Sequence, residues 1–415
     1  MSNNIFKLFL LLVCLMSTLF LTPNTLAIDN PIKTPNNKFG IHIHDETDLE
    51  DVARLVNSNG GDWGYVTLVI RKDERYLQKW QETFDKMRQL HLIPIVRIAT
   101  MQKNSYWEKP QLNEIDSWVD FLNSINWVIK NRYVIIGNEP NHANEWGGEV
   151  NPDEYSDYLY EFSKKLKEKS NDFFVLAAAL DASAPNDSKH MDYEKFTKKL
   201  IARHPDIYEN IDGLNSHSYP NPNFFGSTKD KRRGSIKTYE WELLLLNELG
   251  VKKELPVFIT ETGWTHSTNK IDVQNQLQNI SKNFENAFSD IWEKDVKVVA
   301  VTPFILNYQD VPFDIFSWKD KEGRFFEYYY KIQLLPKIKG DPKIKNSLEI
   351  KAILTPKILI KDNLRFSLAY AKNTGQAIWE KGNTYQITDG FREYILQAFY
   401  PRSIEPFNSG IILIS

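Results

Sequence analysis

From residue 38 onward, short apolar runs alternate with longer stretches in which apolar residues recur at helical spacing. The runs are rich in β-branched residues and bounded by turn residues, so we expect buried strands at Phe39–His44, Trp63–Ile70, Ile93–Thr100, Val134–Gly137, Phe173–Leu180, Ile211–Ser216, Val257–Thr260 and Val298–Leu306. The stretches between and after them predict helices at Leu49–Ser58, Tyr76–Leu90, Leu112–Ile129, Pro152–Lys169, Tyr193–Arg203, Ser235–Leu249, Gln274–Glu293 and Phe325–Leu335.

Eight strand–helix units in a row predict a fold of the α/β class, a (β/α)8 barrel over residues 38–336. The working face of such a barrel lies at the carboxyl ends of its strands. An open doubly wound sheet is the competing arrangement. No G-x-G-x-x-G follows the first strand, which disfavours a dinucleotide-binding version of that sheet.

The periodicity changes after the barrel. Residues 337–346 form a linker rich in Pro and Lys. Short apolar runs then predict a small all-β module over residues 347–415, with strands at Leu348–Leu354, Leu364–Tyr370, Tyr385–Ile387 and Tyr394–Phe399. The run from Ala371 to Gly375, followed by Trp379, resembles the N-T-G-x-x-x-W pattern of immunoglobulin-like accessory domains, although the module is shorter than that fold usually requires.

Composition and the first residues narrow the class of protein. The chain has 415 residues, of which 42% are hydrophobic, and its net charge of −3 leaves no basic excess for binding nucleic acid. Residues 1–27 have the form of a secretory signal peptide, with Lys7 before the mostly apolar Leu8–Leu21 and a small residue, Ala27, at the end. We therefore expect a secreted or cell-envelope protein, with an uncleaved anchor as the alternative. The single cysteine, Cys14, lies in this segment, so a processed chain would hold no disulfide and no cysteine nucleophile.

Two stretches place a glutamate at the end of a predicted buried strand. In Val134–Asn141, which reads VIIGNEPN, Asn138 and Glu139 follow the strand; in Pro256–Trp264, which reads PVFITETGW, Glu261 does. An isolated N-E-P is as well explained by a turn or a helix cap. A second glutamate in the same setting favours acid/base and nucleophilic chemistry at the anomeric carbon of a sugar.

Other polar residues fall inside the predicted strands. Arg97 would be a cation in the barrel mouth and would need a carboxylate partner, Glu139 or Glu261, whose pKa it would lower. His42 and His44 are two residues apart on the first strand and so point the same way, and we expect His44 to line the substrate site. No acidic triad accompanies them, so we expect no metal. We also expect no cofactor, because a carboxylic acid and a carboxylate suffice for the chemistry.

The two glutamate motifs resemble those of the clan of retaining glycoside hydrolases that carry catalytic glutamates on strands 4 and 7 of a (β/α)8 barrel. The resemblance covers residues 38–336 and is greatest to family 39, with the cellulase-like family 5 sharing much of the pattern. It implies that Glu139 is the general acid/base and Glu261 the nucleophile. It also implies that Asn138 binds the 2-hydroxyl of the sugar and that the reaction retains the anomeric configuration.

The same resemblance implies further substrate contacts. His217 and Tyr219 in NSHSYP after the sixth strand would bind substrate and hold Glu261, with a barrel-core role for His217 as the alternative. Trp318 beyond the eighth strand would form the floor under the sugar, and Trp264 and Trp146 are further candidate platforms, because aromatic faces suit the C–H faces of pyranose rings. For each tryptophan, packing in the core is the alternative.

These observations together predict a secreted retaining glycoside hydrolase that cleaves β-glycosidic bonds in a polysaccharide or oligosaccharide. A barrel that binds carbohydrate without turnover is disfavoured because both glutamates are present. A transglycosylase, which passes the same covalent intermediate to another sugar, stays open. The expected partner is a carbohydrate, with no nucleic acid and no membrane beyond the N-terminal segment.

Overall fold

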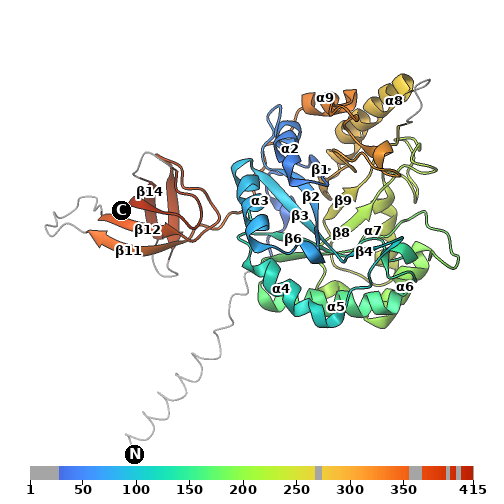
Figure 1. Ribbon diagram of the computed structural model, residues 1–415, viewed down its shortest axis with the longest axis horizontal. Coiled ribbons are helices and arrows are strands. Elements are labelled where there is room, and N and C mark those ends of the chain that lie inside the picture. Colours follow the sequence, from blue (N-terminus) through green and yellow to red (C-terminus); the bar gives the residue numbers. More distant parts are fainter. Residues whose placement is uncertain (1–27, 267–272, 355–366, 389–392, 399–402, 415) are drawn as a thin grey trace, which may run out of the picture.

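A computed structural model describes residues 28–266, 273–354, 367–388, 393–398 and 403–414. Residues 1–27, on which the signal-peptide prediction rests, lie outside this range. Eight parallel strands form the centre of the larger part of the molecule (Figure 1): β1 (Gly40–His42), β2 (Gly64–Arg71), β3 (Leu92–Ala99), β6 (Arg132–Ile136), β7 (Phe173–Ala177), β8 (Leu214–His217), β9 (Val257–Glu261) and β10 (Val298–Val301).

The strands close into a barrel. Strands β1, β2, β3, β6 and β7 form one parallel sheet in that order, and β8, β9 and β10 form another. Two parallel bridges join the sheets, Leu176 to Gly213 between β7 and β8, and Phe39 to Val301 between β1 and β10. Each predicted barrel strand is present, so the prediction of a (β/α)8 barrel is confirmed and the open sheet is excluded.

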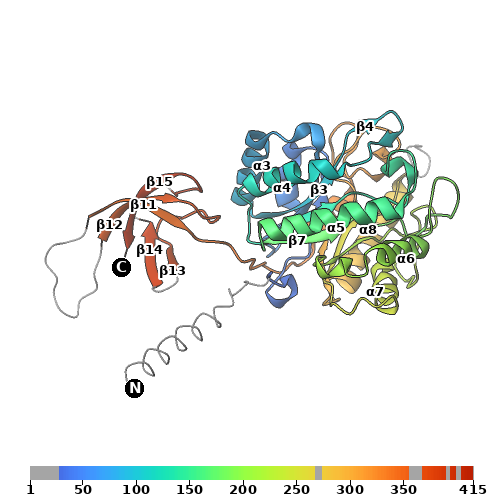
Figure 2. The same ribbon diagram turned by 90° about the horizontal axis from the view of Figure 1, so that it is seen from below.

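Helices surround the barrel (Figures 1 and 2). In the described residues they are α2 (Leu49–Val56), α3 (Leu77–Gln89), α4 (Ile115–Ser124), α5 (Pro152–Lys169), α6 (Tyr193–Arg203), α7 (Thr238–Glu248), α8 (Val273–Asn286), which continues as a π-helical segment (Ala287–Trp292), and α9 (Glu327–Leu334). Short 3₁₀ helices lie at Pro31–Lys33, Glu46–Asp48, Lys72–Glu74, Leu112–Glu114, Ala143–Glu145, Ile207–Glu209 and Asp314–Phe316, and a small hairpin, β4 (Gln102–Lys103) and β5 (Tyr106–Trp107), follows β3.

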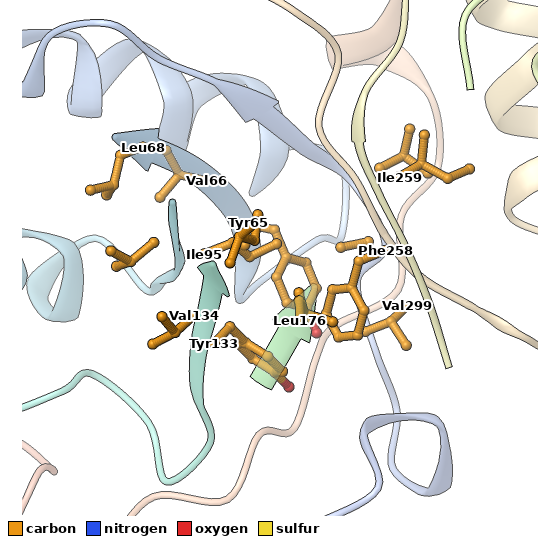
Figure 3. Close-up of a cluster of buried hydrophobic side chains, with 14 of the residues drawn as sticks. Tyr65, Val66, Leu68, Ile95, Tyr133, Val134, Leu176, Phe258, Ile259 and Val299 are labelled. Carbon is orange, nitrogen blue, oxygen red and sulfur yellow. The ribbon is translucent and has the colours of Figure 1, made fainter. Parts of the chain in front are cut away.

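Large aromatic side chains fill the inside of the barrel. Figure 3 shows Tyr65, Tyr133 and Phe258 gathered around Leu176. The rings of Tyr133 and Phe258 lie 5.1 Å apart, and those of Tyr65 and Tyr133 lie 6.2 Å apart. All of these side chains are at most 2% exposed. The interior is therefore a packed core, which leaves the strand ends as the place for a binding site.

The C-terminal part is an antiparallel sheet with the strand order β11 (Leu348–Leu354), β12 (Ser367–Asn373), β15 (Ser409–Ile414), β14 (Glu393–Ala398) and β13 (Thr384–Thr388). The sequence analysis missed β15. A small core forms on this part, with Trp379 fully buried. Asn373 of the N-T-G run is also fully buried and donates from Nδ2 to the carbonyl oxygens of Ala377 and Ile404. The immunoglobulin-like assignment and the division into domains stay predictions.

In the part of the chain that the structure describes, no helix combines the length and the apolar character needed to cross a membrane.

Candidate active site

Glu139 is placed by a turn that follows β6. Gly137 has a φ of 91° and Glu139 a φ of 31°, the latter in a region that residues other than glycine rarely adopt and that is enriched at functional sites. The turn is tied to the segment just after β7, because the N–H of Glu139 donates to the carbonyl of Ala179 at 3.1 Å. The side chain of Glu139 thereby emerges at the carboxyl ends of the strands.

Glu261 is the last residue of β9 and is only 8% exposed. Its Oε1 accepts a hydrogen bond from Nη1 of Arg97 at 2.8 Å, and its Oε2 accepts one from the hydroxyl of Tyr219 at 3.1 Å. Burial alone would raise the pKa of Glu261, but the positive charges of His217 and Arg97 and the bond from Tyr219 outweigh it, so that this pKa lies below its ordinary value. Glu261 is therefore held in its ionised form.

His217 lies between the two glutamates. Its Nδ1 is 2.6 Å from Oε1 of Glu139 and 3.7 Å from Oε2 of Glu261. Burial lowers the pKa of His217, but the two carboxylates raise it more, so the net shift is upward. Tyr219 thus contacts Glu261 and His217 contacts both glutamates, while the binding of substrate by these two residues stays a prediction.

The two carboxyl groups lie close together. One oxygen of Glu139, one of Glu261 and a ring nitrogen of His217 all lie within 4.8 Å of one another. Retaining glycosidases hold their carboxyl groups about 5–5.5 Å apart, whereas inverting enzymes need about 6.5–9.5 Å to admit a water molecule. One oxygen of each group within 4.8 Å of the other is compatible with the shorter spacing.

Arg97 has two partners. Its Nη1 donates to Glu261 and also to Oδ1 of Asn138. The sequence analysis named Glu139 and Glu261 as possible partners of Arg97. Arg97 pairs with Glu261 and contributes to the lowered pKa of that carboxyl group.

The two histidines of the first strand differ in their surroundings. His42 is buried, with Nε2 3.9 Å from Oε1 of Glu261, and burial together with the charge of Arg97 lowers its pKa to about 3. It is therefore neutral at working pH, and its approach to Glu261 is no ion pair. His44 follows the end of β1, is exposed, and packs edge-on against Tyr308 at 5.0 Å.

By distance alone, Glu139, His217 and Glu261 could also hold a metal ion. The cationic Arg97 already pairs with Glu261, and the pKa of His217 is raised. Both features favour bound protons over a divalent cation, because a histidine must be deprotonated to bind a metal.

The tryptophan predictions need correction. Trp318 is 1% exposed, and its ring packs against Phe284 and Tyr328 at 5.0 Å each, so it belongs to the core and not to the floor of a sugar site. Trp264 is 4% exposed, contacts Phe284 and donates from Nε1 to the carbonyl of Gly226, so it is not a platform either. The helices α8 and α9 supply Phe284 and Tyr328, and they cover both tryptophans.

Trp146 has an intermediate position. Its ring is 3% exposed and packs edge-on against Tyr155 and Tyr158. It also borders a small pocket together with Arg97 and Asn138. Its predicted contact with substrate stays a prediction.

The sequence analysis missed the aromatic residue that stands at the site. Phe304 follows β10, is partly exposed, and packs edge-on against His42 with ring centroids 5.1 Å apart. Phe313 and Phe316 each lie 5.7 Å from it and extend this aromatic wall. The signal was available, because Phe304 lies within the predicted eighth strand, Val298–Leu306.

The sequence analysis also did not name Glu145 as a candidate site residue. It ends the 3₁₀ helix Ala143–Glu145 and borders the same pocket as Arg97 and Asn138. Nothing in its sequence context distinguishes it from an ordinary loop glutamate.

No family model matches the chain, and no curated protein matches it. Solved structures resemble it at low identity. A family 39 glycoside hydrolase from Bacteroides cellulosilyticus WH2 is 13% identical with a TM-score of 0.49, over 93% of this chain and 82% of that chain. A family 128 (subgroup II) endo-β-1,3-glucanase from Pseudomonas viridiflava is 13% identical with a TM-score of 0.46, over 72% and 98%. An endo-β-1,4-glucanase from Xanthomonas axonopodis pv. citri is 12% identical with a TM-score of 0.47, over 71% and 98%. These structures are of glycoside hydrolases, and at this distance the likeness concerns the fold alone.

Proposed function

We propose that the protein is a retaining glycoside hydrolase that cleaves β-glycosidic bonds in a polysaccharide or oligosaccharide by double displacement. The observation that carries the proposal is the pair of carboxyl groups at the strand ends, Glu139 and Glu261, with oxygens within 4.8 Å of each other. That spacing suits a nucleophile and an acid on opposite sides of one glycosidic bond.

In the first step, an oxygen of Glu261 attacks the anomeric carbon while the glycosidic C–O bond breaks. Glu139 gives its proton to the departing oxygen, and a covalent glycosyl–enzyme forms. In the second step, Glu139 takes a proton from water, the water oxygen attacks the anomeric carbon, and Glu261 leaves as a carboxylate. Two inversions give net retention.

The neighbouring residues fit these roles. Arg97 and Tyr219 keep Glu261 ionised and aimed, as a nucleophile must be. Nδ1 of His217 lies 2.6 Å from Oε1 of Glu139, close enough for the two groups to exchange a proton during the reaction. Phe304, in place of a tryptophan, would support the apolar face of the sugar.

Further parts of the proposal concern the rest of the chain. Residues 1–27 would direct export, consistent with a polymeric carbohydrate outside the cell. The C-terminal sheet would be an accessory module that packs on the barrel and does not bind the reacting sugar.

The test is activity with trapping. The wild type, Glu261→Gln and Glu139→Ala are assayed on laminarin, carboxymethyl cellulose and xylan. A second panel holds 4-nitrophenyl β-glycosides of glucose, xylose, galactose, mannose, cellobiose and laminaribiose. We expect turnover by the wild type on at least one substrate, and a loss of about 10⁴-fold or more in kcat for Glu261→Gln, because the covalent step has no nucleophile.

Mechanism-based 2-fluoro glycosides then identify the nucleophile. We expect an adduct on the peptide that contains Glu261. For Glu139→Ala, added azide should restore turnover of an activated aryl glycoside and yield the β-glycosyl azide. Turnover that survives Glu261→Gln unchanged would refute the assignment of the nucleophile, and an α-configured first product would refute retention.

A further inference from the structure

Glu145 is brought next to the catalytic motif by two consecutive turns. The N–H of His142 donates to the carbonyl of Glu139 at 2.9 Å, and the N–H of Glu145 donates to the carbonyl of His142 at 3.1 Å. The chain therefore folds back, and Glu145 lines one pocket with Arg97 and Asn138.

The side-chain amide of Asn138 is held from both ends. Its Oδ1 accepts from Arg97, so the orientation of the amide is set and its nitrogen faces away from that cation. The carboxyl group of Glu145 lines the same pocket and interacts with the Asn138 side chain. Since Oδ1 of Asn138 is taken by Arg97, an ionised Glu145 can engage only the amide nitrogen, which sets the amide in one orientation.

The carboxyl group of Glu145 also lies among charges. Burial first, and the negative charge of Glu139 second, raise its pKa to about 7, while Arg97 and the bond to Asn138 oppose this shift. The charged groups that face Glu145 are Arg97 of β3, Glu139 after β6, Glu261 of β9 and the neighbouring His142. In the adjoining loops, Lys109 pairs with Glu149 and Glu154, and His190 pairs with Asp187.

We propose that Glu145 is a positioning residue that orients the Asn138 amide toward the substrate. The inference rests on the proposed glycosidase function and deepens it.

Two substitutions test this role. Glu145→Gln keeps an oxygen that accepts from Asn138 but removes the charge. We expect its kcat/KM to match that of the wild type, because the contact with Asn138 is kept. Glu145→Ala removes the acceptor as well, and we expect kcat/KM to fall about ten- to hundredfold, as misplaced contacts do.

The loss in Glu145→Ala should depend on the 2-hydroxyl. The probes are the fastest 4-nitrophenyl β-glycoside of the panel and its 2-deoxy analogue. If Glu145 acts through Asn138, the alanine variant loses much less on the 2-deoxy probe than on the parent. Glu149→Gln is the matched control, because Glu149 is an exposed glutamate of the same loop and pairs with Lys109 outside the cluster. It should leave both readouts unchanged.

A measurement without turnover keeps the two proposals distinguishable. In protein labelled with ¹³C at the glutamate carboxyl groups, one resonance, absent in Glu145→Gln, should titrate near pH 7 and move to lower pH in Glu139→Gln. A titration near pH 4.5 that ignores Glu139→Gln, or equal losses on the two probes, would overturn the role of Glu145. Coupled titration in a protein that cleaves no panel substrate would overturn only the glycosidase function.

Discussion

At the scale of single residues, the two carboxyl groups of the site, Glu139 and Glu261, differ in their surroundings. The side chain of Glu261 is 11% exposed and receives hydrogen bonds from Arg97 and Tyr219, whereas that of Glu139 is 22% exposed and contacts the shared His217. The more enclosed group has the lowered pKa, because the surrounding positive charge outweighs the cost of burial. A group of this kind suits a nucleophile, which must stay ionised.

Replacing Arg97 by methionine tests whether its charge lowers the pKa of Glu261. The pKa of Glu261 lies below its ordinary value partly because of Arg97, so removing that charge raises it. Since the ionised form is the active one, the acidic limb of kcat/KM should move to higher pH by about one unit. A pH profile between 3 and 8 measures the shift. Arg71→Met, at the exposed end of β2, should leave the profile in place, and an unmoved acidic limb in Arg97→Met would contradict the electrostatic role.

The residues that the sequence could predict are those whose direction follows from strand position. Glu139, Glu261 and Arg97 stand at or near strand ends, and a parallel barrel brings such ends together whatever the loops do. Trp318 and Trp264 could not be placed in this way. Whether a tryptophan beyond a strand faces a sugar or the core depends on how the following helices pack, and that is a contact between segments far apart in the sequence.

At the scale of elements, Trp318 contributes to the packing of helices against the barrel. It joins the segment after β10 to α8 and α9, through Phe284 and Tyr328. Trp318→Ala should therefore lower the free energy of unfolding by about 3–5 kcal/mol, the usual cost of removing a large buried side chain. Urea denaturation measures this change. A variant that is as stable as the wild type but inactive would restore the role that the sequence analysis gave Trp318.

Phe304→Ala should behave in the opposite way. The ring is partly exposed at the end of β10 and lies beside His42 and the aromatic wall. We expect kcat/KM to fall about ten- to hundredfold through loss of sugar packing, with a small change in urea midpoint. Steady-state kinetics and urea denaturation of both variants provide the comparison. If Phe304→Ala and Trp318→Ala changed kcat/KM and the urea midpoint equally, the assignment of Phe304 to the sugar site and of Trp318 to the core would be refuted.

At the level of elements, the sequence predicted the barrel strands because each is a compact apolar run bounded by turn residues. Helices α5 and α6 were predicted with their observed bounds, Pro152–Lys169 and Tyr193–Arg203. The strands β4 and β5 have two residues each, which is too short for any periodicity. Strand β15 was missed although Ser409–Ile414 contains a local apolar run, and it pairs with both β14 and β12.

At the scale of the whole molecule, the C-terminal sheet attaches to the end of the barrel opposite the catalytic face. Figures 1 and 2 both show it beside the barrel, joined by the linker. Nε2 of Gln376 donates to the carbonyl of Ile129 at 2.7 Å, and Lys345 pairs with Asp172. Ile129 and Asp172 precede β6 and β7, so these contacts lie at the amino ends of the strands. We therefore expect the sheet to contribute to stability without shaping the proposed sugar site.

Gln376→Ala tests this separation of roles. Gln376 is 5% exposed and bonds the barrel from Nε2 while its Oε1 accepts from the backbone N–H of Lys345. Truncating it leaves buried backbone groups unpaired, so the free energy of unfolding should fall by about 1–3 kcal/mol. Calorimetry measures the loss, and Asn383→Ala, an exposed position in the same sheet region, is the control. Because the contact lies at the far end of the barrel, kcat should stay at the wild-type value. A fall in kcat without a change in stability would mean that the sheet acts on the site through the barrel.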